Sequence, residues 1–124
     1  METDQRMEDQ EIWKCSFALA CFIYSVTDRD SFCLDIDLRK KARKLMVRIL
    51  SSIIESFETG NPREAGEFLR QAVVSLRDLK QTLISAYQCG CLNFQEFSKV
   101  RAECGKLSSM LLAPEMDNRG VGTG

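Results

Sequence analysis

The sequence predicts an all-α fold, an antiparallel up-down-up-down four-helix bundle, and three observations support this prediction. Apolar residues recur at helical spacing through four segments, and no strand alternation persists beyond a few residues. Capping and turn signals separate the segments by short intervals, which makes consecutive helices antiparallel neighbours. The chain has 124 residues, of which 44% are apolar and 28% charged, enough for the core of one domain.

The first predicted helix covers residues 11–26 and follows an acidic segment, residues 1–10, that we expect to be flexible. Trp13, Phe17, Ala20 and Tyr24 share one face. The remaining apolar residues widen the apolar surface well beyond one stripe, which predicts that the helix is buried on two sides. We expect the second side to be a subunit interface. Its candidate residues are Ile12, Leu19, Phe22 and Ile23.

The second and third predicted helices meet at a sharp turn. The second covers residues 32–58, with a polar loop before it and Gly60 as a stop after it. Asn61 is a suitable N-cap for the third helix, Pro62 fits its first position, and Glu64 stands where a capping box has its acid. We expect the third helix to end at Gly90.

The fourth predicted helix covers residues 94–112. Asn93 and Glu96 form a second capping signature, and Pro114 predicts the end of the helix. Three glycines fall in the last five residues, so we expect residues 113–124 to be a disordered tail. The bundle domain therefore covers residues 11–112.

Basic residues are concentrated in the second predicted helix. Six of the ten residues from 39 to 48 are basic, although the whole chain has a net charge of -1. Helical geometry places several of them in a ridge that faces away from the core, where it could bind phosphates. A solvated helix face with Asp35, Asp37 and Glu55 as local partners is the alternative, and we prefer it for a monomer; a ring of subunits would repeat the ridge and strengthen its field. The candidate nucleic-acid-binding residues are Arg39, Lys40, Lys41, Arg43, Lys44 and Arg48.

Composition argues against most enzymes. The chain has no His, which removes the commonest neutral-pH general base and metal ligand. The six cysteines show no zinc-binding spacing, and we interpret them as free, partly buried thiols. Thiol chemistry at Cys89 and Cys91 is the least supported hypothesis, since no base stands beside them. We expect no catalytic residue, metal or cofactor.

No membrane or export segment is apparent. The longest apolar run, residues 17–24, has eight residues, whereas a membrane-spanning helix needs about 20. The residues before it are acidic, unlike those of a signal peptide. We therefore expect a cytoplasmic protein that does not contact a membrane.

Residues 43–56 and the third predicted helix resemble the proteins encoded in intervening sequences of bacterial 23S ribosomal RNA genes. Those proteins carry R-R-A-x-x-S-I-x-x-N-I-A-E-G and, in the next helix, F-L-x-x-A-x-G-S-L-x-E-L. The positions that agree in character with the first motif are Arg43, Lys44, Ile49, Ile53 and Glu55. Those that agree with the second are Phe68, Leu69, Ala72, Ser75, Leu76, Asp78 and Leu79.

The resemblance implies a four-helix bundle that assembles into a homopentameric ring and has no known catalytic activity. We therefore predict a non-enzymatic, oligomeric protein that associates with RNA through the basic ridge. The alternative function is that of the related accessory proteins of diversity-generating retroelements, which bind a reverse transcriptase and its template RNA. Those proteins are strongly basic, whereas this chain has a pI of about 5.5.

Overall fold

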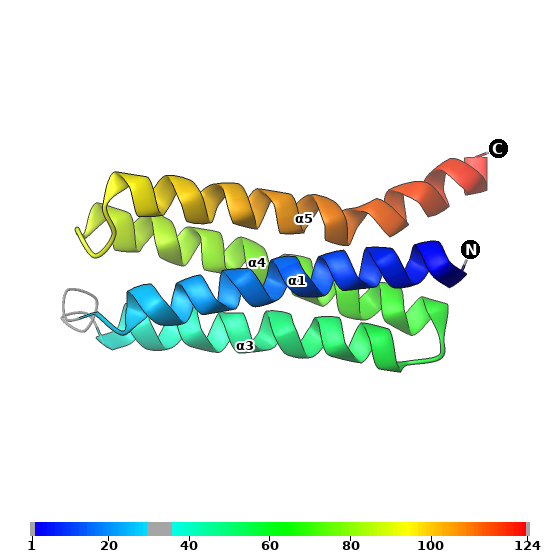
Figure 1. The fold of residues 1–124 in the computed structure, drawn as a ribbon, viewed down its shortest axis with the longest axis horizontal. Helices are drawn as coiled ribbons and strands as arrows, with labels where there is room; N and C mark the ends of the chain where they lie inside the picture. The colour runs from blue at the N-terminus through cyan, green and yellow to red at the C-terminus, as the bar shows by residue number, and fades with distance from the viewer. Residues whose placement is uncertain (1, 30–35, 124) are drawn as a thin grey trace.

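In the part of the chain that the structure describes, four helices surround one core. The computed structural model describes residues 2–29 and 36–123, with side chains over 7–29 and 36–112. The helices are α1 (Glu2–Thr27), α3 (Ile36–Glu58), α4 (Pro62–Gln88) and α5 (Phe94–Thr123). Consecutive helices run in opposite directions, and both termini lie at one end (Figure 1). Because α1 also packs against α5, the prediction of an all-helical four-helix bundle is confirmed for the described residues.

The turn between α3 and α4 follows its sequence signals closely. The Asn61 side chain accepts hydrogen bonds from the backbone N–H groups of Arg63, at 2.9 Å, and Glu64, at 3.3 Å, and Pro62 occupies the first helical position. The Glu64 carboxylate does not close a capping box. It accepts a 2.7 Å hydrogen bond from the Thr59 hydroxyl instead, which ties the turn to the start of α4.

Gly90 ends α4 as predicted, because it has a φ of 82°, a conformation that disfavours other residues. The Gly90 N–H donates to the Tyr87 carbonyl and the Cys91 N–H to the Ala86 carbonyl, the two bonds of a Schellman motif. Three residues further on, a complete capping box opens α5. The Glu96 N–H donates to Asn93 Oδ1 at 2.8 Å, and the Asn93 N–H donates to Glu96 Oε1 at 3.1 Å.

The core is built from the apolar stripes of all four helices. Buried hydroxyl groups within it are satisfied locally: Thr27 donates to the Ile23 carbonyl at 2.6 Å, and Ser56 to the Ile53 carbonyl at 2.6 Å. The largest fully buried side chains are Leu19, Ile23, Met46, Ile49, Ile53, Leu76, Leu79, Leu83, Val100, Leu107 and Leu111.

Two helices extend beyond their predicted bounds. α1 begins at Glu2, so it includes most of the segment that we expected to be flexible, and acidic residues near a helix N-terminus favour such an extension. α5 continues past Pro114 to Thr123, where we expected a disordered tail. A proline inside a helix bends it without always ending it, and the ribbon of α5 changes direction towards its C-terminal end (Figure 1). The predicted start of the second helix at residue 32 lies outside the described residues.

Candidate nucleic-acid interface

Four of the six candidate cations lie exposed on α3. They are Lys40, Lys41, Lys44 and Arg48. Lys40, Lys44 and Arg48 follow one another at four-residue intervals, which places them about 6 Å apart along the helix axis. None of these three forms an ion pair with a described carboxylate. We call Lys40, Lys44 and Arg48 the basic ridge from here on.

The other two candidates, Arg39 and Arg43, are half-buried and bind the end of α1. Arg43 Nε donates to Thr27 Oγ1 at 2.9 Å, and its guanidinium lies 5.0 Å from the centre of the Tyr24 ring. Both arginines also approach Asp28, at 3.8 Å from Arg39 and 3.7 Å from Arg43. These contacts hold α3 against α1. Arg39 and Arg43 therefore have a structural role, in contrast to the exposed cations of the basic ridge.

A shallow groove of about 630 Å³ runs beside the ridge, between α3 and α4. Arg48 lines one side of it and Arg70 the other, with Gln71 and the hydroxyl groups of Ser51 and Ser75 between them. The groove contains one acidic residue, Glu67. Its donors and cations suit an anionic ligand. The contribution of α4 could not be predicted from the sequence, because Arg70 belongs to no basic cluster there.

The four candidate interface residues of α1 lie on its inner side. Ile12, Leu19 and Ile23 are buried in the core, and Phe22 packs against it with the Lys99 ammonium over its ring at 5.4 Å. The bundle itself therefore covers these side chains. The face that we expected at a subunit interface is thus the core face of this helix. Of the face that we expected in the core, Ala20 alone is buried, and its aromatic residues are exposed.

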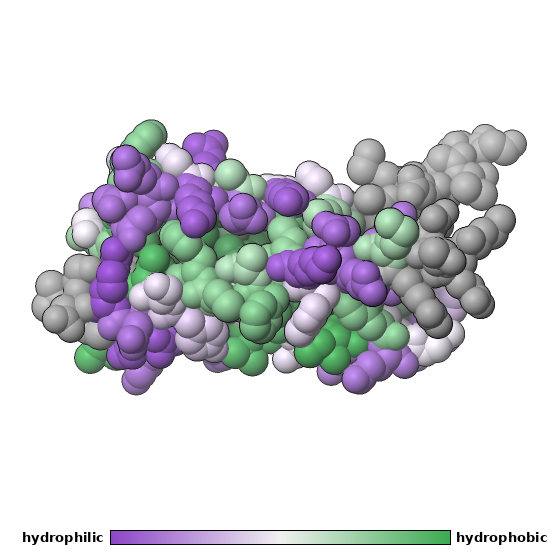
Figure 2. Space-filling view, in the orientation of Figure 1, coloured by the Kyte–Doolittle hydropathy of each residue, from purple (hydrophilic) through white to green (hydrophobic). Residues whose placement is uncertain are grey.

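The exposed apolar surface of α1 includes three aromatic side chains. The exposed fraction is 37% for Trp13, 54% for Phe17 and 40% for Tyr24. α3 adds two further exposed side chains, Ile54 at 38% and Phe57 at 37%. Trp13, Ile54 and Phe57 line an apolar groove between the two helices. Figure 2 shows an apolar area along the middle of the face on which α1 lies. We call these five residues the aromatic face.

The described cysteines form no disulfide with one another. Burial raises the pKa of Cys104 to about 12, and burial, reinforced by the nearby Glu103 carboxylate, raises that of Cys15. Cys91 is buried and Cys89 is exposed. Among the described residues, no group of three or more Cys, Asp or Glu side chains is arranged to hold a metal ion.

The fold and surface thus define an all-helical bundle that carries a basic ridge on one helix and an apolar aromatic face on two. No helix within the described ranges has both the length and the apolar character that crossing a membrane requires. The family model of the 23S rRNA-intervening sequence protein matches residues 8–113, so the chain belongs to this family, as the motifs on α3 and α4 indicated. No curated protein and no solved structure matches the chain significantly.

Proposed function

We propose that the protein is a non-enzymatic cytoplasmic bundle that assembles into a homopentameric ring and binds RNA through the basic ridge. The observation that carries RNA binding is the row of three exposed cations, Lys40, Lys44 and Arg48, one helical turn apart and without carboxylate partners among the described residues. A ridge of this kind neutralises phosphates and releases counterions.

The chemistry of the neighbouring groove favours contact with the RNA backbone over contact with bases. Proteins that hold single strands stack bases on aromatic side chains. None of the residues that line the α3/α4 groove is aromatic, whereas Arg48, Arg70 and Gln71 offer donors for phosphate oxygens. We therefore expect binding that tolerates changes in sequence and prefers a structured or duplex RNA.

A matched pair of variants tests the assignment of the ridge. Lys44→Glu with Arg48→Glu reverses two charges on the ridge, and Lys106→Glu with Arg101→Glu makes the same change at two exposed positions of α5. Fluorescence anisotropy with a labelled 20-base-pair RNA duplex measures affinity over a series of salt concentrations. We expect the ridge pair to weaken binding more than tenfold and to reduce the salt slope by about 1 for each lost contact. Equal losses in both pairs would refute the ridge.

The aromatic face supports the assembly. Single exposed apolar residues are common on protein surfaces, but a contiguous apolar area marks an interaction site. The aromatic face is such an area, because it brings together the exposed side chains of Trp13, Phe17, Ile54 and Phe57. In a closed ring, each subunit would cover this face of its neighbour and repeat the basic ridge five times around the assembly.

Native mass spectrometry of protein purified from cells without nuclease tests both parts. We expect a mass of five subunits with additional RNA, and five bare subunits after the ridge pair is introduced. Phe17→Glu is expected to release monomers, whereas Val74→Glu, an equally exposed apolar position on α4, leaves the ring intact. A monomer in the unaltered protein would refute the assembly.

A further inference from the structure

A cavity opens at the end of the bundle where the two termini lie. It has a volume of about 750 Å³ and is bordered by all four helices and by the α3–α4 turn. Its walls are mainly apolar, with Leu69 from α4 and Met110 and Leu111 from α5. Volumes of 300–1,000 Å³ with apolar walls and a few polar groups are typical of small-molecule sites. We call this space the end cavity.

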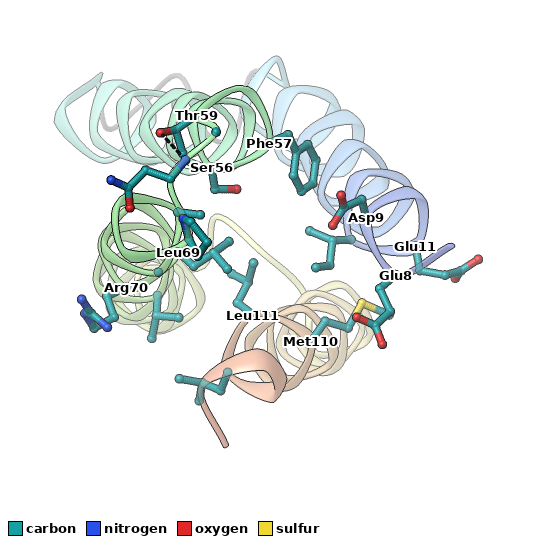
Figure 3. A pocket seen from close by; sticks show the side chains of 18 of the residues that line it. Glu8, Asp9, Glu11, Ser56, Phe57, Thr59, Leu69, Arg70, Met110 and Leu111 are labelled. Carbon is teal, nitrogen blue, oxygen red and sulfur yellow. Dashed lines mark hydrogen bonds between the residues drawn. The ribbon is translucent and has the colours of Figure 1, made fainter. Parts of the chain in front are cut away.

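The polar side chains that point into the end cavity accept hydrogen bonds. Figure 3 shows the Asp9 carboxylate directed inward beside the Phe57 ring, and Ser56 directed inward from α3. Ser56 is 8% exposed and its hydroxyl proton is already donated to the Ile53 carbonyl, so its oxygen remains available as an acceptor. The ring face of Phe57 is also electron-rich and attracts cations.

The charged groups around the mouth reinforce this preference. Glu8 adds a carboxylate from α1, whereas the side chains of Glu11 and Arg70 point away from the cavity in Figure 3. A ligand with an anionic head would meet carboxylates and an acceptor hydroxyl. A ligand with an ammonium head would find a negative charge, a hydrogen-bond acceptor and an aromatic ring, together with apolar walls for a hydrocarbon chain.

We propose that the end cavity binds an aliphatic amine. Asp9, Ser56 and Phe57 hold its ammonium group, and its hydrocarbon chain lies along Leu69, Met110 and Leu111. This site lies apart from the basic ridge and is independent of RNA binding, because it selects a cation and the ridge selects an anion.

Isothermal titration calorimetry at pH 7 with three ten-carbon probes tests the charge preference. The probes are n-decylamine, n-decanol and decanoate, each kept below the concentration at which it forms micelles or separates from solution. At this pH the amine is protonated, as lysine is. We expect saturable binding of one n-decylamine per chain and binding of decanoate at least tenfold weaker. Decanoate that binds as tightly as the amine, or an amine signal that never saturates, would overturn the proposal.

Two matched variants locate the ammonium group. Asp9→Asn and Glu11→Gln each remove one negative charge from α1, but in Figure 3 the Asp9 side chain faces the cavity and that of Glu11 points away. We expect Asp9→Asn to weaken n-decylamine about tenfold with little effect on decanol, and Glu11→Gln to change either affinity less than twofold. Equal effects of the two variants would contradict the assigned position.

A third variant tests the apolar walls. Leu69→Trp fills the space between α4 and α5 and is expected to abolish binding of both the amine and the alcohol. Circular dichroism and thermal unfolding establish whether the Leu69→Trp variant is folded. If that variant is unfolded, Ala65→Leu, a smaller change at another lining position, takes its place. Undiminished amine binding in a folded cavity-filling variant would overturn the proposal.

Discussion

Replacing Glu96 with Gln is expected to destabilise the bundle at neutral pH by about 1 kcal/mol. The Glu96 carboxylate accepts from the Asn93 N–H and holds both terminal nitrogens of Arg29, one of them at 3.0 Å, so it joins the start of α5 to the end of α1. The amide oxygen of Gln can still accept from the Asn93 N–H and from one Arg29 nitrogen, but its NH2 group cannot accept from the other. The bonds that remain lose their charge assistance, and charge-assisted bonds are roughly twice as strong as neutral ones. The side chains of Glu96 and Arg29 are 20% and 41% exposed, so solvent screens their interaction. We therefore expect a loss of about 1 kcal/mol, below the roughly 1.5–3 kcal/mol typical of hydrogen bonds to charged groups.

The pH dependence of this loss identifies its cause. Burial by itself raises the pKa of Glu96, but the Asn93 N–H and the Arg29 guanidinium outweigh it and hold the pKa below its usual 4.5. The carboxylate therefore stabilises the fold fully above about pH 4.5, and this contribution is lost as the pH falls through the lower pKa of the folded state.

Thermal unfolding followed by circular dichroism at pH 7 and pH 3 measures the effect. We expect Glu96→Gln to lower Tm by about 4 °C at pH 7, from the usual entropy of unfolding per residue, and by less at pH 3. Glu55→Gln serves as a control, because Glu55 is exposed and forms no ion pair with a described residue. A deficit of the same size at both pH values would refute the charge-based explanation.

Three further predictions concern the turn, the core and the thiols. Gly90→Ala, at a φ of 82°, should cost about 1–2 kcal/mol and lower Tm in calorimetry, and an unchanged Tm would contradict the Schellman assignment. Ile53→Ala, at a fully buried position, should cost about 2–5 kcal/mol in urea unfolding, and a loss below about 1 kcal/mol would place this residue outside the core. Among the described cysteines, Cys21 and Cys89 should react with a disulfide reagent in the native protein, whereas Cys104, whose pKa is raised to about 12, should react only after denaturation; rapid native labelling of Cys104 would show that this part of the core opens.

The helix pattern and the turns could be predicted because their determinants are local. Asn61, Pro62, Gly90 and the Asn93–Glu96 pair act within one or two turns of helix, and each occupies the position that its sequence context indicates. Glu64 is the exception. Its partner is the Thr59 hydroxyl, which sequence spacing alone does not distinguish from a capping-box partner.

The orientation of α1 could not be predicted because both of its faces are apolar. Periodicity locates stripes, but it does not state which stripe meets the other helices when two compete. The structure buries the aliphatic Leu19 and Ile23 and leaves the aromatic Trp13 and Phe17 outside.

The split of the basic cluster also depends on tertiary contacts. Six cations within ten residues look equivalent in the sequence, yet Arg43 has a hydroxyl and an aromatic ring as partners because the end of α1 lies beside it. Lys44, one residue later, points elsewhere and remains exposed. Separating structural from available charges requires knowing which helix lies alongside, and that information is not local.

The contact between α1 and α5 has a consequence for how the chain folds. The α3–α4 hairpin has the most extensive interface and is joined by the three-residue turn 59–61, so it closes a small loop. Pairing of α1 with α5 joins the two ends of the chain and encloses everything between them, which carries the largest loop-closure entropy. We therefore expect the hairpin to form the folding nucleus and the α1–α5 seam to close last, so that hydrogen exchange is slowest in α3 and α4 and fastest along that seam.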